Sequence, residues 1–140
     1  MDDLRVRAFE DGDREAVVAL WNEVFADDPP RNAPELVIDR KRVTQRDLFL
    51  VAIHRGQLVG TVLGGYDGFR GWLYHLAVRP DHRRSGFGRR LVETLEGLLR
   101  ERGCPKLNLQ VRGGNEGARR FYAQLGFAVE DRISLAKVLP

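Results

Sequence analysis

The sequence predicts a mixed α/β fold in which helices cover both faces of a central sheet. Two observations lead to this prediction. First, segments with a two-residue apolar period, typical of strands, alternate along the chain with segments whose apolar residues recur every three or four positions, typical of helices. The resulting order is β-α-α-β-β-β-α-β-α-β. Second, the 140 residues contain no repeat, no low-complexity tract and no linker, so we expect one domain over residues 1–140.

The first part of the chain predicts one strand and two helices. Leu4–Phe9 alternates apolar and charged residues, as a half-buried strand does. Asp13 can cap the helix that follows, and the pair Pro29-Pro30 stops the chain from continuing as a helix. A second, shorter helix is expected from Pro34 to about Gln45.

The middle of the chain predicts three successive strands. They cover residues 48–54, 58–66 and 72–78, and a tight turn at Arg55–Gln57 joins the first two into a hairpin. Gly64 and Gly65, inside the second of these strands, indicate a bulge or a close approach of two backbones.

The last part predicts two helices and two strands. Apolar residues with helical spacing run from Phe87 to Leu99, and Gly103 can close that helix. A strand is expected at 107–111, then a short helix capped by Asn115 and ended by Gly126, then a final strand at 127–138. The strand, helix and strand between residues 72 and 111 imply a parallel, right-handed crossover.

The composition is typical of a globular protein, with 43% hydrophobic and 31% charged residues. The longest apolar run covers residues 48–53, whereas a membrane span needs roughly 20 residues. The first residues are acidic, unlike a signal peptide, and Cys104 is the only cysteine, so no internal disulfide can form. We therefore expect a cytoplasmic protein without membrane contact, and we predict no metal site.

The net charge of +3 hides an uneven distribution. The first 35 residues carry ten acidic against four basic side chains, whereas the rest carry nineteen basic against ten acidic. Twenty of the 23 basic residues are arginine, whose guanidinium binds phosphate through paired hydrogen bonds. The excess fits either a solvated arginine-rich surface or a phosphate-bearing ligand, and the local motifs decide between the two.

A basic loop with two glycines lies between the strand at 72–78 and the helix that starts at Phe87. The first amides of a helix lack intrahelical partners and lie at the positive end of its dipole, so they can bind a phosphate. Gly86 and Gly88 can turn further amides toward such a ligand. The loop lacks the Lys-Ser/Thr pair of nucleotide P-loops and the third glycine of dinucleotide folds. The residues expected at a pyrophosphate are Arg83, Arg84, Ser85, Gly86, Phe87, Gly88 and Arg89.

This loop resembles the R/Q-x-x-G-x-G/A signature of the GCN5-related N-acetyltransferase (GNAT) family, which holds the pyrophosphate of acetyl-CoA. Tyr74–Pro80 is similar to the family's fourth strand, and the stretch from Asn115 to Phe127 is similar to its second motif. The order of elements agrees from about residue 4 to residue 139. Residues 64–68 and 102–106 further resemble the YpeA-like branch of bacterial acetyltransferases. The resemblance implies a sheet that is splayed between its fourth and fifth strands.

The resemblance also implies how acetyl-CoA would be held and used. The main chain of Leu76, Ala77 and Val78 would pair with the pantetheine arm, and the amide of Val78 would polarise the acetyl oxygen. Tyr122 occupies the position of the family's general acid, and its phenol, with an ordinary pKa of about 10, can donate to the departing thiolate. Asn115 is expected both to cap its helix and to contact the coenzyme.

The group that takes the proton from the acceptor is left open by the sequence. Gln110 stands where related enzymes often have glutamate, and an amide cannot accept that proton. His75, Tyr74 and Asp67 are candidates, and strand alternation places Tyr74 and His75 on opposite faces. Proton loss through ordered water is an equal alternative. We expect direct transfer in a ternary complex, without an acyl intermediate on Cys104.

The acceptor is expected to be a primary amine that enters beside the first two helices. Acidic residues gather there and would favour a cationic amine, although an ordinary acidic surface is the simpler explanation for them: Asp27, Asp28, Glu35 and Asp39. The sequence does not identify the amine.

Two other functions and an assembly question stay open at this point. A CoA-binding sensor without catalysis is an alternative because of Gln110. A nucleic-acid-binding module would use the arginines, but no helix-turn-helix or RNA-binding aromatic signature accompanies them, so no nucleic acid is expected as a partner. Dimers are common among similar proteins, which leaves a homodimer as an open expectation.

Overall fold

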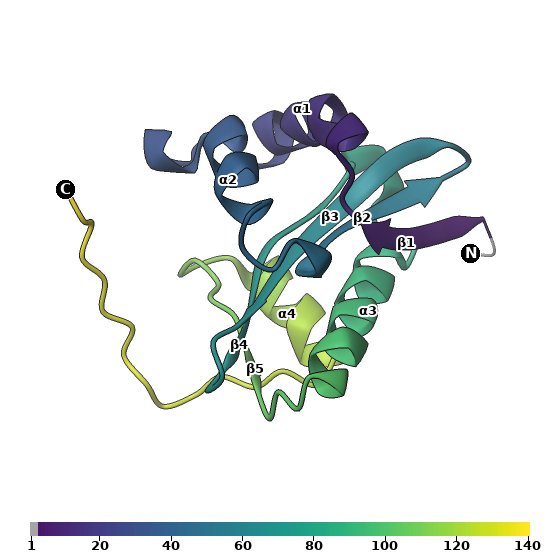
Figure 1. The fold of residues 1–140 in the computed structure, drawn as a ribbon. Coiled ribbons are helices and arrows are strands. Elements are labelled where there is room, and N and C mark those ends of the chain that lie inside the picture. The colour runs from purple at the N-terminus through teal and green to yellow at the C-terminus, as the bar shows by residue number, and fades with distance from the viewer. Residues whose placement is uncertain (1–2) are drawn as a thin grey trace. The chain divides into compact units, whose positions relative to one another are not determined.

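The computed structural model describes residues 3–140 (Figure 1). These residues form two compact units. The first unit extends to Leu109 and the second covers Gln110–Pro140. The sheet and three helices belong to the first unit, and a fourth helix belongs to the second. That both units form one domain over residues 1–140 stays a prediction.

The first unit is built on a five-stranded sheet with the strand order β1-β2-β3-β4-β5. Each of the first four strands runs antiparallel to its neighbour, whereas β5 runs parallel to β4, as the expected crossover requires. The strands are β1 (Leu4–Ala8), β2 (Phe49–His54), β3 (Gln57–Tyr66), β4 (Gly71–Val78) and β5 (Leu107–Asn108). The predicted mixed α/β class is confirmed.

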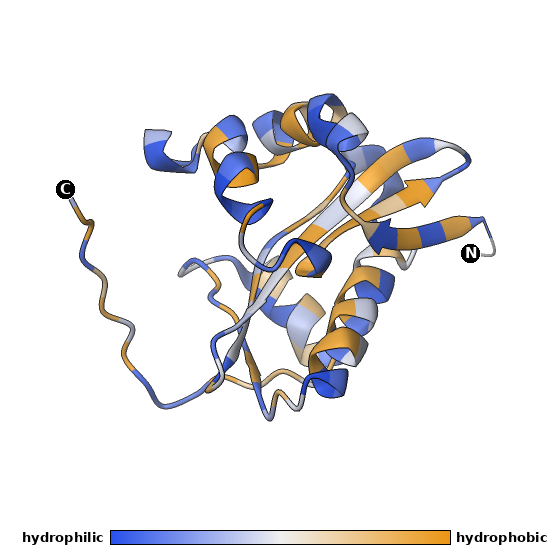
Figure 2. Ribbon diagram, viewed as in Figure 1, coloured by the Kyte–Doolittle hydropathy of each residue, from blue (hydrophilic) through white to orange (hydrophobic). Residues whose placement is uncertain are grey.

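Helices cover both faces of this sheet (Figure 1). Helices α1 (Arg14–Val24) and α2 (Pro34–Lys41) lie on one face, and α3 (Phe87–Glu101), which connects β4 to β5, lies on the other. Figure 2 shows apolar residues along the strands and on α3 at helical intervals. No helix of residues 3–140 is long and apolar enough to cross a membrane.

Aromatic rings form the core on the face that α1 covers. Phe49 stacks on Phe9 with ring centroids 4.3 Å apart, and Trp21 of α1 lies 5.8 Å from Phe49. All three rings are buried. They fix α1 over the middle of the sheet, where its side chains reach β3 and β4.

The opposite face requires a close approach of α3 to the sheet. A Cβ on Gly64 of β3 would lie 2.2 Å from a methyl carbon of Leu95, so a larger residue at this position would force the Leu95 side chain to move. The close contact at Gly64 is made by a side chain, not by a second backbone as expected for the Gly64-Gly65 pair, and the bulge that was the alternative lies in β4, as described below.

Asp13 was expected to cap α1 but makes no capping hydrogen bond to that helix. Its carboxylate accepts two hydrogen bonds from the guanidinium of Arg7, at 2.8 and 3.0 Å, and one from the amide of Glu10 at 2.9 Å. A charged partner on β1 therefore competes successfully with the helix amides.

Helix α2 ends at Lys41 rather than near Gln45. Gln45 adopts a left-handed backbone with φ 52°. Its side-chain amide donates to the carbonyl oxygen of Tyr66 at 2.8 Å and accepts from the amide of Tyr66 at 2.9 Å. This pairing with the end of β3 takes Gln45 out of the helix.

The second unit contains α4 (Glu116–Gln124). Asn115 caps it as predicted, accepting a hydrogen bond from the amide of Ala118 at 3.1 Å. Gly126, with φ 95°, ends the turn that follows, and the amide of Phe127 donates to the carbonyl of Tyr122 at 3.0 Å. These features are typical of a glycine-terminated helix.

The predicted final strand at 127–138 is wrong, and the predicted strand at 107–111 shortens to the two residues of β5. A strand is stable only beside hydrogen-bonded neighbours, and residues 127–140 pair with no strand of the described chain. Large apolar side chains of this segment are exposed: Val129, Ile133, Leu135, Val138 and Leu139.

Candidate active site

The loop between β4 and α3 presents a run of unsatisfied amides. Gly86, at the N-cap of α3, has a left-handed backbone with φ 82° and ψ 5°, and its carbonyl accepts the amide of Arg90 at 3.1 Å. The amides of residues 84–89 donate no hydrogen bond to any described residue, and no side chain caps α3. The positive end of α3 is therefore available to an anion, as the loop motif predicts.

The side chain of Phe87 has a structural role. It is buried, and its ring lies 5.0 Å from the ring of His54 and 5.7 Å from the ring of His82. These contacts hold the first turn of α3 against the end of β2, so Phe87 offers only its amide to a ligand. No sequence motif marks His54 or His82, because the fold alone brings them together.

The arginines of the loop are not equivalent. Arg83 and Arg84 are exposed and form no ion pair within residues 3–140. Arg89 pairs with Glu93 one helical turn later, with 3.3 Å between nitrogen and oxygen. Arg83 and Arg84 therefore supply the unpaired positive charge beside the amides of the loop.

Strands β4 and β5 part soon after they meet. They pair at Gly71 with Leu107 and at Trp72 with Asn108, and no further pair follows. From Leu73 to Val78 the outer edge of β4 has no partner in β5. This is the splay that was expected between the fourth and fifth strands.

A β-bulge lies within the unpaired part of β4. Leu63 of β3 is opposite Tyr74 and Thr61 is opposite Ala77, so β4 has one residue more than β3 between these pairs. His75 occupies the bulge with φ 50°, in the left-handed region that non-glycine residues seldom adopt.

The bulge decides which amides of β4 face the open edge. Along a strand, the main-chain amides point alternately to its two edges. A residue whose amide bonds to the strand on one side is therefore followed by a residue whose amide points to the other side. The amide of Gly71 donates to Lys106 on the β5 side at 2.8 Å, and the amide of Arg79 donates to Val59 of β3 at 2.8 Å. Counting back from Arg79, the amides of Val78 and Leu76 point away from β3. A regular strand counted from Gly71 would point both of them at β3.

The same bulge places Tyr74 and His75 on one face of the sheet. Tyr74 is opposite Leu63, which belongs to the core beneath α1. The ring of His75 lies 4.8 Å from both Trp21 and Phe25, which also belong to α1 or its end. The expectation of opposite faces is wrong, because it assumed an unbroken alternation.

Burial changes the acid–base properties of both side chains. It lowers the pKa of His75, and the negative charge of Asp28 opposes this in part, so the imidazole is neutral at pH 7. Burial and, to a smaller extent, the charge of Asp67 raise the pKa of Tyr74. Tyr74 as a whole remains 50% exposed, and its ring stacks on Trp72 with centroids 6.3 Å apart.

Asp67, the third candidate base, is committed to a turn. Its Oδ1 accepts hydrogen bonds from the amides of Phe69 and Arg70, both at 2.8 Å, and these bonds lower its pKa. It lies beyond the far end of β4 from Val78, more than about 20 Å along an extended strand. Asp67 is therefore unsuited to take a proton at the open edge.

Cys104 packs beneath the start of β4. A Cβ on Gly71 would lie 2.7 Å from its sulfur, and the thiol donates to the carbonyl of Lys106 at 3.3 Å. These contacts give Cys104 a place in the packing between β4 and β5.

The second unit holds the remaining predicted site residues. Tyr122 is half-buried between Phe121 and Phe127, with ring centroids 5.0 and 5.5 Å away, and burial raises the pKa of its phenol to about 12. Gln110 donates through its side-chain amide to the hydroxyl of Ser134. Asn115 uses its oxygen for the cap, which leaves its amide nitrogen for a ligand.

The acidic residues near α1 and α2 are partly neutralised. Asp39 pairs with Arg14 at 2.8 Å, and Arg40 donates to the carbonyl of Arg31 at 2.6 Å in the same region. One of the four acidic residues that were expected to attract a cationic acceptor, Asp39, is therefore already paired with a base.

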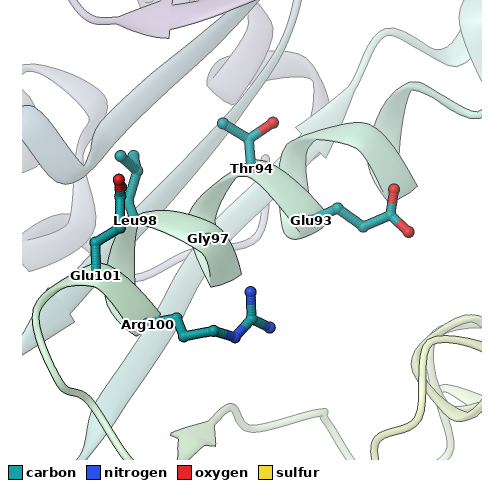
Figure 3. Close-up of a pocket in the computed structure, with 6 residues that line it drawn as sticks. All are labelled: Glu93, Thr94, Gly97, Leu98, Arg100 and Glu101. Atoms are coloured by element: carbon teal, nitrogen blue, oxygen red, sulfur yellow. The ribbon is translucent and has the colours of Figure 1, made fainter.

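A shallow hollow lies along the outer side of α3 (Figure 3). It starts two turns into the helix, and Gly97 in its middle lies about three turns from Gly86. It therefore takes no part in the loop site. Its lining residues are Glu93, Thr94, Gly97, Leu98, Arg100 and Glu101. Within residues 3–140, no group of three or more His, Cys, Asp or Glu side chains could hold a metal ion.

Comparison with known proteins identifies the family. The model of the Acetyltransferase (GNAT) family matches residues 14–127. An acetyltransferase of Yersinia pestis is 43% identical over 136 residues, which cover 97% of this chain and 96% of the relative. The crystal structure of Ard1 from Thermoplasma volcanium superposes with a TM-score of 0.81 at 27% identity, covering 91% of this chain and 84% of that one.

A further solved structure, the PaiA N-acetyltransferase of Thermoplasma acidophilum in complex with coenzyme A, has a TM-score of 0.80 at 20% identity and covers 93% of this chain and 92% of its own. The protein is an acetyltransferase by fold and by sequence. It belongs to the GNAT family, as the loop, the fourth strand and the Asn115–Phe127 segment together predict. Its place in the YpeA-like branch stays a prediction.

Proposed function

We propose that the protein transfers the acetyl group of acetyl-CoA directly to a primary amine within a ternary complex. The observation that carries this proposal is a pair of main-chain donor groups without partners, one at the open edge of β4 and one in the loop that connects β4 to α3. The first group consists of the outward amides of Leu76 and Val78, and the second of the amides of residues 84–89; the amides of Arg79, His82 and Arg83 between them are hydrogen-bonded.

The loop would hold the pyrophosphate. Its free amides lie at the positive end of α3, and the left-handed backbone of Gly86 turns the chain there without a Cβ in the way. Arg83 and Arg84 would add charge-assisted hydrogen bonds. A solved protein of similar fold that contains coenzyme A supports the choice of ligand.

The edge of β4 would hold the pantetheine arm through main-chain hydrogen bonds, and acetyl-CoA brings the activated acetyl group. The amide of Val78 would donate to the acetyl oxygen, where negative charge develops during transfer. The donor is fixed by the sheet before the ligand arrives, so it needs no reorganisation at the moment of reaction.

Tyr122 would donate a hydrogen bond to the sulfur as it departs. A pKa of about 12 keeps the phenol protonated at pH 7. The same high pKa disfavours complete proton transfer to a thiolate, so Tyr122 stabilises the leaving group as a donor.

The acceptor would approach over the face where Tyr74 and His75 lie. His75 is neutral at pH 7 because burial lowers its pKa, which is the protonation state of a general base. Its ring is packed against Trp21 and Phe25, so a water molecule would carry the proton between acceptor and imidazole. We propose the cytoplasm as the compartment, where the single cysteine stays reduced.

Two measurements test the proposal. Isothermal titration calorimetry with coenzyme A should show one site per chain, and a thiol reagent should report free coenzyme A from acetyl-CoA only when an amine is present. The amine panel should include amino acids, polyamines, aminoglycosides and peptides with free N-termini.

Each outcome has a distinct meaning. Binding without thiol release across the whole panel would favour the CoA-binding sensor. Absence of binding to coenzyme A, together with a salt-sensitive shift of nucleic acid, would overturn the proposal in favour of the nucleic-acid module.

A further inference from the structure

The bulge of β4 is attached to the core by a buried hydrogen-bond chain. The indole Nε1 of Trp21 donates to the hydroxyl of Thr61 at 2.8 Å, and that hydroxyl donates to the main-chain carbonyl of His75 at 3.1 Å. Thr61 is 0% exposed and is the one polar residue in the buried core of the described chain. A polar side chain in such a position needs a reason, because burying it without partners is costly.

The direction of each bond in this chain is fixed by chemistry. An indole nitrogen can only donate, so it must use a lone pair of the Thr61 hydroxyl. The hydroxyl proton is therefore available for the carbonyl of His75, which can only accept. The chain has no alternative arrangement that satisfies all three groups.

The residue that receives this bond has the strained backbone. A left-handed φ of 50° is unfavourable for a histidine, and such a conformation persists only where its surroundings hold it. The hydroxyl of Thr61 holds the carbonyl of His75 from β3, and the rings of Trp21 and Phe25 hold the imidazole from the other side.

We propose that Thr61, oriented by Trp21, is a positioning residue for the acetyl-binding edge. It keeps the extra residue of β4 at His75, and this residue is what turns the amides of Leu76 and Val78 outward. If the bulge flattened or moved past Val78, the amide of Val78 would point toward β3. It would then form a hydrogen bond between the two strands and would no longer be available to a ligand. The inference rests on the proposed function, since it gives these amides their ligand.

The test compares three variants with the wild-type protein. Thr61→Val keeps the shape but removes the hydroxyl, and Thr61→Ser restores the hydroxyl. Val51→Ala is the matched control, because Val51 is buried and directly opposite Thr61 on β2 but makes no hydrogen bond to the bulge. All three variants are expected to lose some thermal stability.

Calorimetry with coenzyme A separates positioning from stability. Thr61→Val should bind one equivalent of coenzyme A with at least tenfold lower affinity, Thr61→Ser should bind with nearly the wild-type affinity, and Val51→Ala should keep the wild-type affinity. The proposal would be overturned if Thr61→Val bound coenzyme A with unchanged affinity. It would also be overturned if only the number of binding sites per chain fell, because a residue that serves stability alone changes the fraction of folded protein and not the affinity of each folded molecule.

A second readout does not depend on the ligand. The amide of Arg79 donates to Val59 in the wild-type protein, so it should be protected from hydrogen exchange. In Thr61→Val this protection should fall more than the protection of β2 amides, and Thr61→Ser should restore it. If the wild-type protein fails to bind coenzyme A while this exchange pattern holds, the proposed function is wrong, but the role of Thr61 in holding the bulge is confirmed. If the exchange protection of the Arg79 amide is the same in Thr61→Val as in the wild-type protein, Thr61 does not hold the bulge.

Discussion

Gly60 of β3 faces the carbonyl oxygen of Ala77 in β4 so closely that a Cβ on Gly60 would lie 2.8 Å from that oxygen and 3.0 Å from a methyl carbon of Leu91. The main chain of β4 cannot give way at this point without moving Val78, which is opposite Gly60 in the ladder. The interface between these two strands therefore sets the position of the proposed acetyl-binding edge.

Gly60→Ala should destabilise the protein and weaken its binding of coenzyme A. The cost in unfolding free energy should be about 1–3 kcal/mol, as is usual for overpacking, and urea denaturation would measure it. Gly97→Ala is the control, since Gly97 lies within α3 with no atom near its missing Cβ. It should gain up to about 1 kcal/mol in helix propensity and bind normally. If Gly60→Ala has the same free energy of unfolding as the wild-type protein, β3 and β4 can move apart at this point without a loss of stability, and the prediction is wrong.

Gly86→Val should abolish the binding of coenzyme A through the loop. Gly103→Val is a matched control for strain, because both glycines have left-handed backbones, at φ 82° and 79°, at opposite ends of α3. Both variants should lose comparable stability in thermal denaturation. Only Gly86→Val should fail to bind in calorimetry, and equal affinity in the two variants would remove the loop from the site.

Tyr122→Phe should lower kcat by a factor of about 10² or more, the usual loss when one hydrogen-bond donor to a developing negative charge is removed, while the affinity for coenzyme A changes little. The reason is that the phenol acts only when charge appears on sulfur. Tyr66→Phe is the control, because the hydroxyl of Tyr66 makes one long contact, 3.4 Å from the carbonyl of Gly68. Wild-type turnover by the Tyr122→Phe protein would exclude the donor role.

Lys41 should make stability depend on alkaline pH. Burial, together with the charge of Arg102, lowers its pKa to about 8, while its ammonium donates to the carbonyl of Gly64 at 2.5 Å. The unfolded chain keeps the proton until about pH 10.5, so between pH 8 and 10.5 it binds more protons than the folded protein. Stability contributed by this group therefore rises with pH across that range.

Thermal melts at pH 7.5 and 9.5 would measure this effect. The change in Tm of the wild-type protein between the two pH values should be more positive than that of Lys41→Met, which keeps the apolar stem. Parallel pH dependence in the two proteins would mean that Lys41 titrates normally.

The sequence predicted those parts of the fold whose signals are local. The helical spacing of α3, the alternating strands β2 and β3 and the glycines that end α3 and α4 follow from propensity and periodicity. The basic loop at Gly86 was equally visible, since two glycines and several arginines precede the helix there, and its role as an anion site stays a prediction.

The bulge at His75 could not be read from the sequence. Bulges are often marked by glycine, but the strain here is borne by a histidine, and the groups that hold it come from Trp21 and Thr61, which are 54 and 14 residues away along the chain. The error about the faces of Tyr74 and His75 followed directly. Asp13 was misassigned for a similar reason, because Arg7 satisfies its carboxylate in place of the helix.

The outward amides of Leu76 and Val78 are main-chain groups, which every amino acid except proline supplies. An alanine scan of β4 would therefore pass over the acetyl-binding edge without a signal, however important it is. Only edits to the backbone would reveal it, such as proline at position 78 or an ester in place of the amide. Divergent members of a lineage could likewise change the side chains here freely and keep the chemistry.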